Sequence, residues 1–223
     1  MDYSEKKARM KSGVINCAIP LTREECRGNC YRVTVDGMKG GHYKEILGTG
    51  HINAAVVLSR VLYKFQTRWF MRIVSVDGGT GAEDTIASAS AVVMFEGEKT
   101  PAELAQYMFD LFKEECNPAG VEPHMDVRVE AWERTMLPMD ETSTLRVLGF
   151  LVVAPNGEQV ISSDENHQEL IYANVGKLET KEEEFCAEYG VSGTVPSQKR
   201  LAGARIRLMC RVCGGSGSRV WEA

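Results

Sequence analysis

The chain has 223 residues, of which 43% are hydrophobic and 26% are charged, a balance typical of a globular domain with a sizeable core. Its net charge of −5 at pH 7 gives no basic footprint for nucleic acid or an anionic membrane, so neither partner is expected. No apolar run approaches the roughly 20 residues that span a bilayer, and the charged start lacks a signal-peptide pattern. We therefore expect a cytoplasmic protein whose seven cysteines are free thiols.

Six elements are predicted between residues 31 and 133, in the order strand, helix, strand, strand, helix, strand. The strands are Tyr31–Asp36, Phe70–Val76, Ser88–Phe95 and Asp126–Trp132, and the helices are Asn53–Phe65 and Thr100–Cys116. Alternating apolar residues indicate the strands, and apolar residues at helical spacing indicate the helices. Asn53 is suited to cap the first helix, and Thr100 with Glu103 is typical of a capping box. This order predicts an α+β fold, a ferredoxin-like βαββαβ sandwich with an antiparallel sheet and helices on one face.

A second α/β block is expected over about residues 134–213. Its predicted elements are a helix at Thr142–Val153, capped by Thr142 or Ser143, and strands at Tyr172–Lys177 and Arg205–Val212. Residues 179–202 are polar and rich in turn residues, and no element is assigned there. The domain is expected to span 14–218, after an N-terminal lead of 1–13 and with a flexible, glycine-rich tail at 214–223. No internal repeat is visible.

Several motifs resemble one family. Lys39-Gly40-Gly41-His42 and Gly50-His51-Ile52-Asn53-Ala54 resemble the lid of aminoacyl-histidine dipeptidases, the carnosinase-type zinc metallopeptidases of the aminoacylase and carboxypeptidase clan. The segments Ile73–Gly79, Ala154–Gly157 and Asn174–Gly176 resemble later parts of the same lid. The resemblance implies a lid and dimerisation domain, inserted in a zinc-binding catalytic domain that this sequence lacks. It also implies a homodimer, a dipeptide substrate, and a chain that holds no cofactor and is inactive alone.

The same resemblance implies the site residues. His42 corresponds to a histidine that reaches the substrate in the partner subunit's active site, where its N–H would stabilise charge on the scissile carbonyl oxygen. Arg211 corresponds to an arginine whose guanidinium suits a C-terminal carboxylate, and Asn174 and Asp84 fall at further substrate-binding positions. Without such a role, His42 would be a surface histidine in a glycine turn, and Arg211 would be a solvent-exposed arginine at a strand edge.

Departures from the family pattern accompany these residues. Asp84 stands where the family tends to have asparagine and would repel a carboxylate. Tyr43 replaces a serine, and Leu170-Ile171-Tyr172 replaces Glu-Thr-Ser. Substrate specificity has therefore changed, or these contacts have been lost. For the dimer, the apolar face of the first helix is a candidate surface, although burial in the core competes for its residues, which include Val56, Val57, Val61 and Phe65.

No metal site is expected. His124-Met125-Asp126 and Glu182–Glu184 imitate the ligand and base motifs of this clan, but zinc needs three or four converging ligands. Two cysteine pairs could form a four-thiolate site, yet nothing in the sequence makes the pairs neighbours; they are Cys26 with Cys30 and Cys210 with Cys213. Two other functions remain open: a stand-alone ferredoxin-like binding or regulatory module, and a small metalloenzyme using His124 and Asp126.

Overall fold

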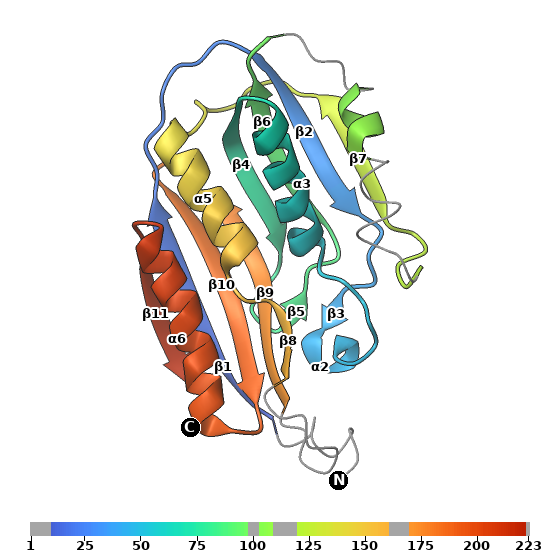
Figure 1. The fold of residues 1–223 in the computed structure, drawn as a ribbon, viewed down its shortest axis with the longest axis vertical. Coiled ribbons are helices and arrows are strands. Elements are labelled where there is room, and N and C mark those ends of the chain that lie inside the picture. The colour runs from blue at the N-terminus through green and yellow to red at the C-terminus, as the bar shows by residue number, and fades with distance from the viewer. Residues whose placement is uncertain (1–9, 98–102, 109–119, 161–169, 222–223) are drawn as a thin grey trace.

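The computed structural model describes residues 10–97, 103–108, 120–160 and 170–221 (Figure 1). In chain order its named elements are β1 (Lys11–Pro20), β2 (Asn29–Asp36), β3 (Gly41–His42), α2 (Tyr43–Ile46), α3 (Ala54–Arg68), β4 (Met71–Gly79), β5 (Asp84–Thr85), β6 (Ala89–Phe95), β7 (Asp126–Ala131), α5 (Glu141–Val153), β8 (Gly157–Val160), β9 (Leu170–Thr180), β10 (Glu184–Gly193), α6 (Pro196–Val212) and β11 (Ser216–Trp221). Residues 103–108 are helical, and the rest of the predicted helix Thr100–Cys116 lies outside the described residues.

One antiparallel sheet organises the molecule. Its strands follow the order β11-β1-β10-β9-β4-β6-β2-β7. The short strand β8 pairs with the first four residues of β9, 170–173. Helices α3, α5 and α6 lie side by side over one face of this sheet (Figure 1). The expected α+β architecture, with an antiparallel sheet and helices on one face, is therefore confirmed. Among the described residues, no helix is both long and apolar enough to cross a membrane.

The sheet is composed of two halves with the same topology. The first half runs β2, α3, β4, β6, the helix at 103–108 and β7, and its strands lie in the order β4-β6-β2-β7. The second half runs β1, α5, β9, β10, α6 and β11, and its strands lie in the order β9-β10-β1-β11. Each half is thus ferredoxin-like, and the first is inserted in the chain between β1 and α5 of the second. The repeat exists in the fold although the sequence shows none.

The two halves meet at a short seam between β4 and β9. Only Gly78 with Leu178 and Gly79 with Lys177 pair as strand residues there. Thr180 extends the seam, because its backbone N–H donates to the Asp77 carboxylate (2.9 Å) and its hydroxyl donates to the Val76 carbonyl (2.9 Å). Helices α3 and α5 pack across the same line.

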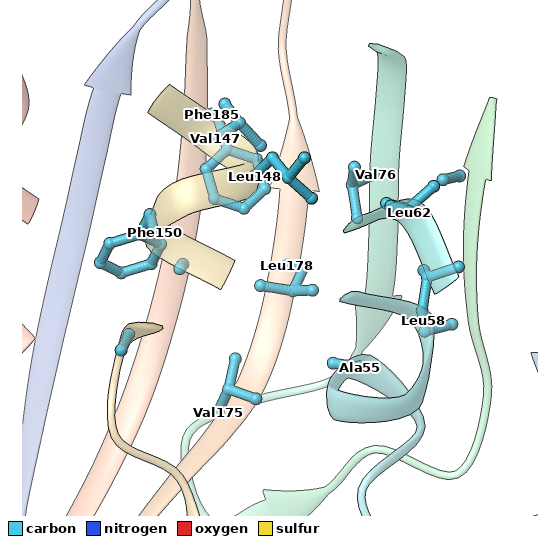
Figure 2. Packing of buried hydrophobic residues seen from close by; sticks show 14 of the residues in the cluster. Ala55, Leu58, Leu62, Val76, Val147, Leu148, Phe150, Val175, Leu178 and Phe185 are labelled. Atoms are coloured by element: carbon cyan, nitrogen blue, oxygen red, sulfur yellow. The ribbon is translucent and has the colours of Figure 1, made fainter. Parts of the chain in front are cut away.

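Buried apolar side chains close the seam from the helix face. Figure 2 shows Leu58 and Leu62 of α3 and Leu148 of α5 among the buried side chains of this layer, together with Val76 of β4 and Leu178 of β9. All of these side chains belong to one buried cluster that runs through both halves. Burial of apolar surface on this scale, at roughly 25 cal/mol per Å², is the main force that holds the two halves together.

Two of the predicted local structures are wrong, and one unassigned stretch contains a strand. Arg205–Val212 is not a strand but the second half of α6, since Ala202, Ile206 and Cys210 are buried at helical spacing. The unassigned stretch before it contains β10. The tail is not flexible at 216–218: Gly214, with φ of +79°, ends the helix, and Ser216 begins β11 at the edge of the sheet.

The structure also changes two smaller expectations, one about a helix cap and one about a helix face. The cap of α5 is Asp140, whose side chain accepts from the Ser143 N–H (2.7 Å), and neither Thr142 nor Ser143 caps it. On α3, Val57, Val61 and Phe65 are buried inside the chain, so the core uses the face that was a candidate for a dimer contact.

The seam generates a prediction about two glycines. A Cβ on Gly176 of β9 would overlap the Gly81 carbonyl oxygen and Ala82, so Gly176→Ala should lower the free energy of unfolding by about 1–3 kcal/mol. Gly149→Ala is the matched control, because a Cβ there meets no atom within 4 Å and alanine favours a helix by about 0.5–1 kcal/mol. Urea unfolding of both variants measures the difference; equal shifts would contradict the close approach at the seam.

Candidate functional site

His42 lies where a two-stranded ribbon meets a short helix. It ends β3, which pairs with β5 so that His42 stands opposite Asp84. It also caps α2, because its Nδ1 accepts a hydrogen bond from the Lys44 N–H (3.2 Å). With Nδ1 as the acceptor, the neutral ring carries its proton on Nε2. Nε2 lies 3.9 Å from the Glu83 carboxylate, and 38% of the His42 side chain is exposed. The ring therefore presents an N–H donor at the surface.

Glycines shape the loop that leads to His42. Gly37, Gly40 and Gly41 all have positive φ, at +76°, +58° and +104°, a region that other residues rarely adopt. Asp36 fixes the start of the loop, since its carboxylate accepts the Gly37 N–H (2.8 Å). That hydrogen bond and the Arg128 guanidinium lower the pKa of the Asp36 carboxyl, so the anchor is charged at neutral pH.

Two tyrosines form a stack beneath the His42 ring. The His42 and Tyr43 rings are 4.8 Å apart at 27°, and the Tyr43 and Tyr172 rings are 5.6 Å apart at 16°. Tyr43 is buried, and its hydroxyl is hydrogen-bonded to the hydroxyls of Ser12 (2.6 Å) and Ser192 (2.7 Å) in the second half. The two departures from the family pattern, Tyr43 and Tyr172, are thus packed against each other. Sequence reasoning lists them separately and misses the contact.

Asn174 connects the ribbon to the sheet. It is fully buried in β9, and its amide donates to the carbonyls of Ala82 (3.2 Å) and Asp84 (3.0 Å). Its oxygen accepts from the Asn53 amide (3.2 Å), and Asn53 in turn caps α3 through the Ala55 N–H (2.9 Å). The polar atoms of Asn174 are all used inside the fold. In this structure Asn174 therefore positions Asp84 and the strand opposite His42.

Asp84 and Arg211 have different positions relative to His42. The Asp84 carboxylate is half-buried and accepts from the hydroxyl of Thr80 (2.9 Å), which lies in the turn between β4 and β5. Arg211 is exposed in the last turn of α6. Figure 1 shows that the end of α6 that leads into β11 lies at the opposite end of the sheet from β3 and α2. The fold thus brings His42, Asp84 and Asn174 together and leaves Arg211 apart.

Glu122 is a site residue that sequence reasoning missed. Its carboxylate is 2% exposed and accepts from the backbone N–H groups of Lys39 and Ile52, both at 3.1 Å. The same carboxylate lies 2.9 Å from Nδ1 of His51. A buried carboxylate is costly unless it is paired and hydrogen-bonded, and here it connects both arms of the segment that carries His42. Glu122 sits in an irregular stretch before Pro123, and no pattern in the sequence marks it.

The motifs that imitate metal ligands do not converge. Within the described ranges, no group of three or more His, Cys, Asp or Glu side chains could hold a metal ion. Asp126 pairs with Arg128 (3.0 Å) in β7, whereas Glu182–Glu184 joins β9 to β10, with β4, β6 and β2 between the two places. The residues of the described part of this chain therefore do not assemble a zinc site from these motifs.

The cysteine pairs are also separated. Cys26 and Cys30 pack in a small cluster with Val74 and Met94, whereas Cys210 and Cys213 belong to the main core. Cys17 contacts Cys210 in that core, and this contact together with burial raises the pKa of the Cys17 thiol. A four-thiolate site that uses both cysteine pairs is not formed.

Comparison with known proteins identifies the fold. No protein-family model matches the chain, and no curated protein matches it. Among solved structures, the arrangement of two ferredoxin-like halves in one sheet matches part of a dipeptidase. That structure is the aminoacylhistidine dipeptidase from Vibrio alginolyticus, with a TM-score of 0.81 over 95% of this chain and 22% sequence identity. The expected resemblance is thus confirmed at the level of the fold.

The match covers only part of the dipeptidase. The chain spans 44% of the length of the solved enzyme. Two other solved structures have TM-scores too low to support an argument. They are an amidase of the hydantoinase/carbamoylase family from Burkholderia multivorans (0.33, 12% identity, 65% of this chain and 34% of that one) and the aminobenzoyl-glutamate utilization protein from Klebsiella pneumoniae (0.30, 13% identity, 57% of this chain and 33% of that one).

The buried Glu122 carboxylate yields a prediction about the loop. Lys39 and Ile52 donate to different oxygens of the Glu122 carboxylate, so in Glu122→Gln the amide NH₂ would face one of these two N–H donors. The negative charge that strengthens both hydrogen bonds, each worth about 1.5–3 kcal/mol, would also be lost. Hydrogen exchange of these two amides should accelerate by roughly tenfold or more, while exchange in β10 stays unchanged. Glu130→Gln, on the exposed strand β7, is the control. Unchanged exchange at both amides would show that Glu122 does not hold the loop.

Proposed function

We propose that this chain is the lid and dimerisation domain, over about residues 14–218, of a zinc-dependent Xaa-His dipeptidase. In this proposal the domain covers the active site and places His42 in contact with the substrate. The zinc is bound by a separate catalytic domain. The observation that carries the proposal is the fold match to aminoacylhistidine dipeptidase over 95% of this chain and 44% of that enzyme. The Gly-Gly-His motif supports it, because its histidine has an exposed ring on a well-anchored ribbon.

The positions of the chain ends support an inserted domain. Gly13 in β1 and Trp221 in β11 are register partners, so the two ends of the described chain leave the same end of the sheet. A domain inserted into a loop of another domain needs neighbouring ends of this kind. Figure 1 shows that β3 and α2, which carry His42, lie toward that same end of the sheet. A catalytic domain attached there would adjoin the surface that presents His42.

The geometry suits His42 to a single chemical task. Its Nε2–H is exposed and its Nδ1 is occupied by the Lys44 N–H, so the ring can donate a hydrogen bond without rearranging. Aimed at a scissile carbonyl, this donor would stabilise the negative charge that develops on the oxygen. The neighbouring carboxylates of Glu83 and Asp84 would repel a substrate carboxylate, which favours a substrate group that is neutral or cationic at this point. The assignment of Arg211 as a further substrate contact stays a prediction.

A domain exchange tests the proposal. The matching part of the Vibrio alginolyticus enzyme is replaced by this chain, and hydrolysis of an Xaa-His dipeptide is measured. The chimera should be active, and His42→Ala in it should lower kcat by roughly 100-fold or more, because one oxyanion donor is lost. This chain alone should hydrolyse nothing. Zinc content and circular dichroism serve as controls for folding. A folded, zinc-loaded chimera that is inactive, or that is unaffected by His42→Ala, would contradict the proposal.

The proposed homodimer has a candidate surface at β7. This strand is last in the sheet order, and no described strand pairs with its outer edge. Antiparallel pairing of two copies about Val129 would place Arg128 of each copy opposite Glu130 of the other, on the same face. Opposite charges at facing positions stabilise such a pair, so the strand is complementary to itself.

Light scattering coupled to gel filtration measures this dimer. The expected mass is twice the 24.7 kDa of the chain. Glu130→Arg should weaken the dimer by about threefold to tenfold, because arginines would then face each other, and the double exchange Arg128→Glu with Glu130→Arg should restore it. Glu133→Arg, outside the strand, is the control. A monomeric wild-type chain at high concentration would exclude this dimer for the chain on its own.

A further inference from the structure

Exposed apolar side chains concentrate on two neighbouring helices. Of the nine large hydrophobic residues that are exposed in the described chain, six lie on α5 and α6. They are Leu145 (47%), Val152 (40%), Val153 (61%), Leu201 (45%), Leu208 (62%) and Val212 (71%). Helices α5 and α6 lie side by side on the same face of the sheet (Figure 1). Exposed apolar side chains that gather on neighbouring elements often mark a site of interaction.

The spacing of these residues forms two helical stripes. On α6, Leu201, Leu208 and Val212 recur at intervals of seven and four, so they lie along one line of the helix. On α5, Leu145 and Val152 are seven apart, with Gly149 between them on the same line. A Cβ at Gly149 would meet no atom within 4 Å, so the middle of this second stripe is open. Two such lines fit the apolar residues of a helix that lies along them.

The positive charge of α6 favours a partner that carries carboxylates. Its 17 residues include five cations and no carboxylate, in a chain whose net charge is −5; the cations are Lys199, Arg200, Arg205, Arg207 and Arg211. Arg205 lies within the apolar line, between Leu201 and Leu208, and Arg200 and Arg211 are exposed on one flank. Arginine is enriched at protein–protein interfaces, and its guanidinium pairs strongly with carboxylates.

Other occupants fit less well. Two copies of the chain meeting through α6 would place arginines of the same sign against one another. The apolar face of a membrane-surface helix carries Trp, Phe or Leu, and the exposed hydrophobic residues described on α5 and α6 include neither of the two aromatic anchors. Nucleic acid binding depends on phosphate contacts, and an apolar line through the centre of the patch contributes none.

We infer that the α5–α6 face is a docking site for an amphipathic helix of another protein, with apolar residues along one side and carboxylates on its flanks. The leucine and valine stripes receive the apolar side, and the arginines of α6 pair with the flanking carboxylates. This site lies on the helix face of the sheet and does not depend on the role of His42.

Two matched peptides of three heptads test the inference on the full chain. Both have leucine at the first and fourth position of each heptad; one has glutamate at the flanking positions and the other lysine. Fluorescence anisotropy should show binding of the glutamate peptide at least tenfold tighter than that of the lysine peptide. Methyl signals of Leu201, Leu208 and Val212 should shift on binding, and signals of the core residue Leu58 should not.

Variants and alternative occupants complete the test. Leu208→Ser and the pair Arg205→Glu with Arg211→Glu should each weaken binding of the glutamate peptide at least tenfold. Tyr63→Ser and Arg27→Glu, which change exposed residues elsewhere, should leave it unchanged. The inference is overturned by equal binding of the two peptides, by no binding, or by shifts confined to another surface. It is also overturned if Leu208→Ser abolishes self-association, or if only vesicles of phosphatidylserine and phosphatidylcholine bind this face.

Discussion

The hydrogen bonds of Asn174 are the constraint on which the candidate site depends. This one amide belongs to β9 in the second half, yet it holds the carbonyls of Ala82 and Asp84 in the first half and contacts the cap of α3. Each strand of the ribbon that presents His42 is only two residues long, and an isolated ribbon of this length is not stable in water. A fully buried amide in a low-dielectric interior supplies the missing rigidity, because every unpaired polar atom there would be costly. The same buried hydrogen bonds therefore join the two halves and hold the candidate site in place.

The site was only partly predictable from the sequence. The elements of the first half follow from alternating and helical patterns, and His42 and Asp84 follow from the resemblance of their motifs. What the sequence cannot show is which segments meet. Tyr43 and Tyr172 appear as two unrelated departures, but the structure stacks them beneath His42 and ties Tyr43 to serines of β1 and β10. Glu122 has no motif at all, since its role depends on backbone N–H groups that any residue could provide.

The second half was harder to predict for a topological reason. Its first strand, β1, precedes the whole of the first half, so the strand order of a ferredoxin-like unit is interrupted in the chain by about half the molecule. Sequential elements are usually neighbours in space, whereas β1 pairs with β10 and β11 near the other end of the chain. The halves also share no visible sequence repeat, so the sequence gives no second indication of the duplicated topology. The same topology needs no similar sequence, because it requires only that each half bury one apolar face of its strands.

Helix α6 shows why one local prediction failed and what the failure means. In an ordinary surface helix only the buried line is apolar, so a helical period is visible in the sequence. Here Ile206 and Cys210 are buried, while Leu208 and Val212 are apolar and exposed, with arginines between them. Apolar residues at every second position from 206 to 212 read as a strand. Leu208 and Val212, the residues that obscure the helical period, do not pack in the core. A helix that keeps a second apolar line in water, at an energetic disadvantage, is explained most directly by a partner that buries it.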